Sequence, residues 1–217
     1  MKRIMLILVL PFIIFQACKK EDSEGNQLPQ ESVLDYMPLT VGNYWIYESF
    51  HCDSGEINCE SVSVDTNFVT TDTLIEGKTY FKIEGEGLYW NEPRYYRDSG
   101  DYIVDNQGNI IFTIHKSDDM YNYHDMIKDG DTIFYWYNHL YDQLVNINVN
   151  AGSFKCLDFR VVLYRSADDF QIEHNAHHMF SENVGPVMET GMFIGSLQVR
   201  RRELVGYFIH AKSTIIP

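Results

Sequence analysis

The chain has 217 residues and a formal net charge of −14 at pH 7, because 31 Asp and Glu side chains outnumber 17 Lys and Arg. A protein this acidic does not bind nucleic acid by neutralising phosphates, so we expect no nucleic-acid partner. Residues 35–217 are long enough for one domain with a sizeable hydrophobic core.

The first residues have the pattern of an export signal. Two basic residues come first, residues 4–15 are apolar, and Ala17 precedes Cys18. The apolar run is too short for a helix that crosses a bilayer, which needs about 20 apolar residues. The segment resembles the signals of bacterial lipoproteins cleaved by signal peptidase II, although Phe15 stands where their motif prefers Leu. The resemblance implies that residues 1–17 are removed and that lipid on Cys18 anchors the protein to a membrane.

Residues 18–34 are polar and contain Gly25 and Pro29, which predicts a flexible, lipid-anchored tether before the globular domain at 35–217. The sequence Lys-Lys-Glu-Asp at 19–22 resembles the tag that sends Bacteroidota lipoproteins to the outer face of the outer membrane. An outer-membrane location with exposure at the cell surface is therefore expected. The alternative is a charged start to a solvated linker, which carries no address.

Beyond the tether, runs of aromatic and β-branched residues alternate with turn sequences, which predicts a fold made mainly of β-strands. Pro38 and Gly42 indicate a turn, and in the strand that follows Trp45 and Tyr47 share one face. Further strands are expected at residues 60–73, 77–84, 88–98, 102–115 (broken at 106–109), 133–137, 144–149, 154–165, 184–194 and 197–209.

Cys52 and Cys59 flank a turn sequence at 53–55, and an oxidising envelope compartment favours a disulfide between them. A metal or redox pair is the alternative, but such pairs use closer spacings. Cys156 lies among apolar residues, which indicates a buried side chain and not a nucleophile.

Several turn-and-strand motifs resemble a family of Bacteroidota outer-membrane lipoproteins of unknown function. The motifs are Pro-Leu-Thr-Val-Gly-Asn-Tyr-Trp-Ile-Tyr at 38–47, Ala-Gly-Ser-Phe-Lys-Cys at 151–156 and Val-Gly-Pro-Val at 184–187. The resemblance implies a curved antiparallel sheet, of the open half-barrel type seen in lipoprotein carriers. It names no chemistry.

Two groups of residues are candidates for a site. A metal site is one hypothesis for His174, His177 and His178, and a solvated acidic loop is the alternative. Aromatic side chains from the middle of the chain could form a platform for sugar rings or an apolar ligand, but core packing is the alternative. These aromatic candidates are Tyr121, Tyr123, Tyr135, Trp136 and Tyr137.

Three consecutive arginines, Arg200, Arg201 and Arg202, interrupt the acidic sequence near its end. Strand alternation predicts that Arg200 and Arg202 lie on one face and Arg201 on the other. We expect them to pair with carboxylates in exposed ion pairs, which contribute about 0–1 kcal/mol each.

Enzyme motifs are lacking: we find no Gly-x-Ser-x-Gly elbow, no phosphate-binding glycine loop and no cysteine with a nearby base. We therefore expect no cofactor and a non-catalytic domain that binds a ligand or a partner on a concave face lined by aromatic residues. A glycan-active hydrolase with a pair of carboxylates is one alternative. A purely structural envelope component is the other.

Overall fold

The computed structural model describes residues 32–53, 58–88, 92–115, 119–192 and 198–210. Cys18 and the whole predicted signal lie outside these residues. The elements of the described part are α1 (Val33–Tyr36), β1 (Tyr44–Cys52), β2 (Cys59–Ile75), β3 (Lys78–Glu84), β4 (Arg94–Asp98), β5 (Tyr102–Asp105), β6 (Ile110–Thr113), β7 (Tyr121–Lys128), β8 (Asp131–Val149), β9 (Gly152–Arg165), the 3-10 turn η1 (Ser166–Asp168), β10 (His174–Ala176), β11 (His178–Ser181), β12 (Gly185–Met192) and β13 (Val199–Phe208).

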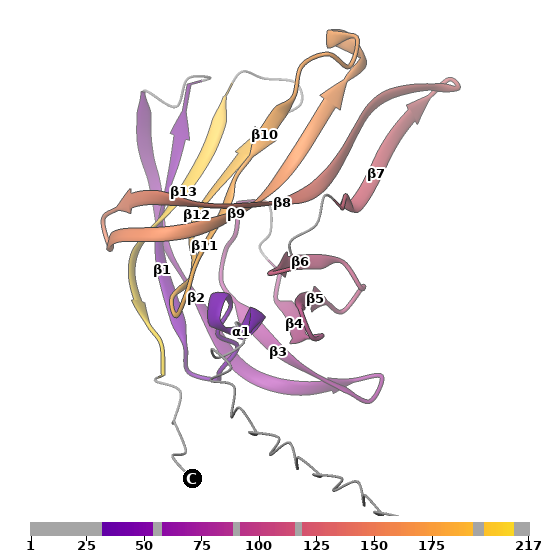
Figure 1. Cartoon of the computed structure of the whole chain (residues 1–217). Coiled ribbons are helices and arrows are strands. Elements are labelled where there is room, and N and C mark those ends of the chain that lie inside the picture. Colours follow the sequence, from indigo (N-terminus) through magenta and orange to yellow (C-terminus); the bar gives the residue numbers. More distant parts are fainter. Residues whose placement is uncertain (1–31, 54–57, 89–91, 116–118, 193–197, 211–217) are drawn as a thin grey trace, which may run out of the picture. The chain divides into compact units, whose positions relative to one another are not determined.

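The described strands form one antiparallel sheet that curves around almost to a barrel (Figure 1). Its order is β6-β5-β4-β3-β2-β1-β13-β12-β11-β9-β8-β7, and β10 pairs with β9. The first strand and the last strand are neighbours, in register from Tyr44 opposite Phe208 to Cys52 opposite Val199. The prediction of a mainly β fold with a curved antiparallel sheet is confirmed.

The two edge strands, β6 and β7, meet at a seam that one side chain bridges. The side-chain Oδ1 of Asn122 accepts a hydrogen bond from the backbone N–H of Ile110 (2.9 Å), and its Nδ2 donates to the Ile110 carbonyl (2.6 Å). The same Nδ2 lies 3.0 Å from Oδ1 of Asn138 on β8. An amide side chain thus takes the place of a strand partner for Ile110, whose backbone groups would otherwise end the ladder.

Aromatic residues from distant strands fill the interior. Trp45 and Tyr47 are each 1% exposed, which confirms that they share a buried face. The indole N–H of Trp45 donates to the Val184 carbonyl (2.6 Å), and the Tyr47 hydroxyl donates to the Pro186 carbonyl (2.8 Å). Both buried polar atoms are therefore satisfied, as large amphipathic side chains require in a core.

Helix α1 packs its first residue into this core. Ser32 and Asp35 form a capping box at its N-terminus, Val33 is fully buried, and the Tyr36 ring lies 5.5 Å from that of Phe112. Leu34 also packs against the core. Val33 and Leu34, which the sequence placed at the end of the tether, are therefore part of the folded structure.

Gly185, the first residue of β12, has φ of +105°, a backbone conformation that favours glycine. A Cβ at this position would lie 2.9 Å from Nε1 of Trp45. The glycine in the Val-Gly-Pro-Val motif therefore lets the Trp45 ring lie against the chain.

A disulfide joins Cys52 at the end of β1 to Cys59 at the start of β2, and the two residues are direct partners in the sheet. Cys156 is fully buried, and burial raises the pKa of its thiol to about 12. A thiol held neutral in this way is not a nucleophile.

The strand boundaries differ from the prediction in three places. Residues 133–137 and 144–149 belong to one 19-residue strand, β8, because an irregularity between Tyr141 and Val145 absorbs the polar residues of the expected break. The strand expected at 88–98 begins only at Arg94, after a proline that cannot donate to a ladder. Strand β7 and the short strands β10 and β11 were not predicted. The turn expected at 195–196 lies outside the described residues.

Candidate functional site

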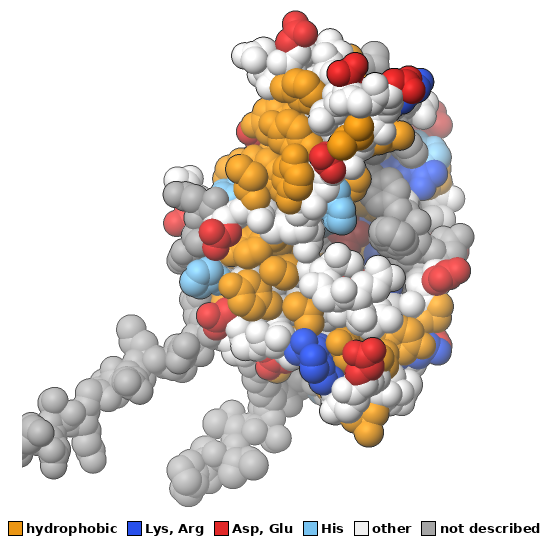
Figure 2. Space-filling view, turned by 90° about the vertical axis from the view of Figure 1, so that its right-hand side faces the viewer, with side chains coloured by type: hydrophobic (Ala, Val, Ile, Leu, Met, Phe, Trp, Pro, Cys, Tyr) orange, Lys and Arg blue, Asp and Glu red, His pale blue; other side chains and the backbone are white. Residues whose placement is uncertain are grey.

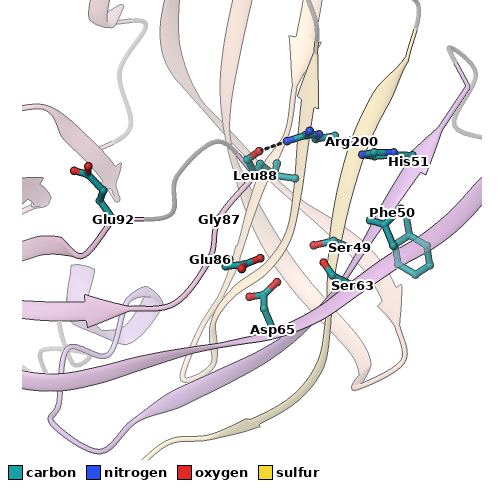
Figure 3. A pocket seen from close by; sticks show the side chains of 11 residues that line it. Ser49, Phe50, His51, Ser63, Asp65, Glu86, Gly87, Leu88, Glu92 and Arg200 are labelled. Atoms are coloured by element: carbon teal, nitrogen blue, oxygen red, sulfur yellow. Dashed lines mark hydrogen bonds between the residues drawn. The ribbon is translucent and has the colours of Figure 1, made fainter.

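A pocket of about 850 Å³ opens on the inner face of β1, β2 and β13 (Figure 3). Residues that follow β3 form its opposite wall. Concave sites of this size are where small ligands bind most often. Its lining residues are Ser49, Phe50, His51, Val62, Ser63, Asp65, Glu86, Gly87, Leu88, Glu92 and Arg200.

One boundary of the pocket is a row of polar side chains that crosses five strands in direct register. We call this row, His178, Glu189, Arg202, Ser49 and Ser63, the polar rung. Two residues further along four of the strands lie buried core residues: Phe180, Val187, Leu204 and Tyr47. The polar rung therefore marks where the inner face changes from an apolar core to a hydrogen-bonding pocket.

Arg202 is the centre of the polar rung and is only 1% exposed. Its Nη2 forms an ion pair with Oδ1 of Asp65 and lies 3.2 Å from Oδ1 of Asn67, and its Nε lies 3.4 Å from Oδ2 of Asp65. Its guanidinium also stacks 3.9 Å from the centre of the Tyr47 ring. A buried cation needs this set of partners, because losing its water shell costs several kcal/mol.

Glu189 of the polar rung lies 4.0 Å from Nη1 of Arg202 and also lines a second cavity of about 40 Å³. Arg94, Tyr96 and Tyr47 line the same small cavity. Burial raises the pKa of both phenols, so that they stay neutral at physiological pH. The interior next to the pocket thus holds two arginines and two carboxylates, whose charges balance.

The pocket walls add further polar groups. Nη1 of Arg200 donates to the Leu88 carbonyl (2.9 Å) and so ties β13 to the segment after β3. Figure 3 shows the carboxylates of Asp65 and Glu86 pointing toward one another, with the hydroxyls of Ser49 and Ser63 beside them. The pocket can therefore offer both donors and acceptors to a ligand.

Arg201 lies on the opposite face from Arg200 and Arg202, as strand alternation predicts. Its guanidinium lies 5.6 Å from the centre of the Phe50 ring, and its Nε is 3.0 Å from Oε1 of Glu203. The prediction of opposite faces is confirmed. The expectation of only exposed ion pairs is wrong for Arg202, because the sheet closes over it.

The five predicted aromatic candidates do not form one platform. Tyr121 is buried and packs 5.9 Å from Phe159 in the core. Trp136 stacks on His124 at 5.0 Å. Tyr135 and Tyr137 alternate with Trp136 along β8 and so lie on the opposite face of the sheet, where Tyr123 stacks on Tyr135. None of the five lines the pocket.

The three histidines also have different surroundings. Nε2 of His174 lies 2.8 Å from Asp168, Nδ1 of His177 lies 2.8 Å from the buried Asp158, and His178 belongs to the polar rung. Burial lowers the pKa of His178. In the part of the chain that the structure describes, no three His, Cys, Asp or Glu side chains are arranged to hold a metal ion. Residues 174–181 form two strands where the alternative hypothesis placed a loop.

The sequence did not identify the polar rung because its members are separated by up to 153 positions, from Ser49 to Arg202 (202 − 49). Only the register of the closed sheet brings them together. The alternation of Arg200 and Arg202 was the one available signal, since it placed two cations on one face.

No protein-family model matches the chain, and no curated protein matches it. Two solved structures are similar to it. A candidate lipoprotein from Parabacteroides distasonis is 10% identical, with a TM-score of 0.40 over 78% of this chain and 96% of the other. A candidate exported protein with a YmcC-like fold, from Bacteroides fragilis, is 9% identical, with a TM-score of 0.39 over the same shares. Function must therefore rest on the chain's own residues.

In the described ranges no helix is both long enough and apolar enough to cross a membrane.

Proposed function

We propose that this chain is a lipid-anchored protein of the outer membrane, exposed at the cell surface, that binds a small polar ligand without chemistry in the pocket above the polar rung. The observation that carries the proposal is the pocket of about 850 Å³ lined by hydroxyl, carboxylate, imidazole and guanidinium groups. The buried Arg202 guanidinium holds the carboxylate of Asp65, which lines the pocket, and it also contacts Asn67 and the Tyr47 ring, so this wall of the pocket is ordered.

The test is native mass spectrometry of the full chain, purified gently from the envelope of its own host. Ser63→Trp fills the pocket, and Val64→Trp is the matched control, since Val64 is the next residue of β2, lies on the outer face and is 64% exposed. We expect a bound mass on the wild type and on Val64→Trp, and none on Ser63→Trp. A bare wild type would instead favour a structural role, and equal occupancy of both variants would show that the ligand binds outside the pocket.

A glycan-active hydrolase is the second candidate, because two carboxylates that line the pocket, those of Asp65 and Glu86, point toward one another in Figure 3. Release of reducing sugar from envelope polysaccharide, lost in Glu86→Gln, would support hydrolysis. Ligand retention by Glu86→Gln with no sugar released by the wild type would support binding alone.

The anchor on Cys18 is tested separately by growing cells with radiolabelled palmitate. We expect label on the wild-type chain and none on Cys18→Ser, which should leave the membrane fraction. Protease added to intact cells then tests the surface location, since only an exposed protein is digested.

A further inference from the structure

Six aromatic side chains lie together on the outer face of β7, β8 and β9, away from the pocket. We call this set the tyrosine face: Tyr123, Tyr135, Tyr137, Tyr141, Tyr164 and Phe170. Figure 2 views the side of the molecule where β7 lies and shows hydrophobic side chains gathered over its upper part. Tyr123 is exposed and the other five rings are half-buried, so the cluster can be reached from solvent. Contiguous apolar surface of this kind marks binding surfaces more often than single exposed residues do.

Tyr135 is the centre of the tyrosine face. Its ring stacks on Tyr123 (5.9 Å between centres, 28° between planes), on Tyr164 (5.2 Å, 24°) and on Phe170 (5.7 Å, 24°). The rings therefore hold one another in place, while Tyr123 remains 53% exposed. A surface that is already ordered loses little conformational entropy when a ligand binds.

Hydrogen-bonding groups line one side of these rings. Glu173 is solvent-exposed, and its carboxylate accepts from the hydroxyl of Tyr164 (3.1 Å), from Nδ2 of Asn175 (2.9 Å) and from the hydroxyl of Tyr141 (3.5 Å). These hydrogen bonds, that of Asn175 first, lower the pKa of Glu173, so that it is ionised at neutral pH. An ionised, exposed carboxylate has lone pairs left for further donors.

We propose that the tyrosine face binds a neutral glycan chain. Pyranose rings would lie on the exposed Tyr123 ring and on the half-buried rings beside it, and their hydroxyls would donate to Glu173. Aromatic rings fit the C–H faces of sugars, and a carboxylate accepts from the hydroxyls at their edges. This surface is independent of the pocket, from which β11 and β12 separate it in the sheet.

The charge of the face argues against a membrane surface as its occupant. Asp125, which is opposite Tyr135 in the sheet, and Glu173 would repel anionic lipid. The face's cation, Arg160, is engaged by Asp158 (2.6 Å) and lies 3.4 Å from the Tyr141 ring. A second copy paired at the edge of β7 is also disfavoured, because two register shifts in β7 interrupt its ladder.

The test uses the full chain in detergent and four neutral hexasaccharides, namely cellohexaose, maltohexaose, xylohexaose and chitohexaose, followed by calorimetry and tyrosine fluorescence. We expect at least one to bind. Tyr123→Ala should weaken it about threefold to tenfold, the effect of losing one ring contact. The control is Tyr207→Ala on β13, where Tyr207 is 40% exposed and distant from the face in the sheet order; it should bind like the wild type.

Glu173→Gln provides a second variant that keeps the shape of the side chain, and it should also weaken binding. The proposal is overturned if no hexasaccharide binds at millimolar concentration, or if Tyr123→Ala binds as tightly as the wild type. Binding to vesicles of phosphatidylethanolamine and phosphatidylglycerol that Tyr123→Ala abolishes would assign the face to a membrane instead. Concentration-dependent dimerisation abolished by the same variant would assign it to a second copy of the chain.

Discussion

The inner face of β1, β2 and β13 and the outer face of β7, β8 and β9 are opposite in character: the first buries charge and the second exposes aromatic rings. Arg202 is 1% exposed, whereas Tyr123 is 53% exposed. Both arrangements depend on neighbours across strands, since Arg202 has Asp65 and Tyr135 has three stacked rings. Register, more than residue type, decides what a curved sheet can place on each side.

The largest effect is expected from breaking the buried charge pair. Asp65→Ala leaves Arg202 buried without its main partner, and this should lower the free energy of unfolding by about 3–5 kcal/mol. Urea unfolding followed by circular dichroism measures the loss. The double variant Asp65→Leu with Arg202→Met should recover most of it, because an apolar pair of similar volume carries no desolvation penalty. If the single variant unfolds like the wild type, the charges are hydrated and the inner face is not closed.

A smaller loss is expected where the chain passes Trp45. Gly185→Ala places a Cβ 2.9 Å from the indole nitrogen in addition to the strain of a positive φ, whereas Gly108→Ala, at φ +92°, meets no atom within 4 Å. We expect about 1 kcal/mol of destabilisation for Gly108→Ala and a clearly larger value for Gly185→Ala. Thermal unfolding of both variants measures the difference, which isolates the contact with Trp45. Equal losses would show that strain alone acts.

The seam between β6 and β7 is expected to contribute less to stability again. Asn122→Ala removes the two hydrogen bonds to Ile110, which should cost about 1–2 kcal/mol. Amide hydrogen exchange should then speed up at Ile110 and along β6. Asn146→Ala, an exposed position of β8, is the control and should change stability by less than about 0.5 kcal/mol. Unchanged exchange in β6 would mean that the edge is held by packing.

The smallest expected effects are changes of stability with pH, and the two faces should show them in different pH ranges. His178 on the polar rung lies near Glu189, Asp158 and His177, and burial lowers its pKa below the usual 6.5. The unfolded chain therefore binds the proton more readily, so stability is complete above pH 6.5 and falls as the pH drops below it. His178→Gln should flatten this part of the curve.

Glu173 on the tyrosine face has a pKa below the usual 4.5, because Asn175, Tyr164 and Tyr141 donate to its carboxylate. Its contribution is present above pH 4.5 and is lost as the pH falls through the lower value of the folded state. Glu173→Gln should flatten only this more acidic region. Urea unfolding at a series of pH values compares the two variants. Identical curves of stability against pH would contradict the assignment of the two pH ranges to His178 and to Glu173.

Local patterns in the sequence predicted the strands whose two faces differ clearly. Trp45 and Tyr47 on one face of β1, and the alternation of Arg200 and Arg201, follow from the period of two in a strand. The same patterns could not predict β7, which is largely exposed on both faces, or the long β8, in which half-buried residues follow one another. The strand predicted at residues 133–137 already separates Trp136 from Tyr135 and Tyr137, but no strand was predicted at 121–128, so the contact of Tyr123 with Tyr135 could not be foreseen.

The pairing of β1 with β13 has a consequence for the order in which the chain folds. β1 begins at Tyr44, but its partner strand ends at Phe208, so the central pair of the sheet forms only after almost the whole chain has been synthesised. Until then β1 has β2 as its only completed neighbour, linked to it by the Cys52–Cys59 disulfide. Such distant pairing slows folding and leaves β1 without its second neighbour until β13 is available, whereas the Cys52–Cys59 disulfide, once it is oxidised in the envelope, links β1 to β2 without waiting for β13.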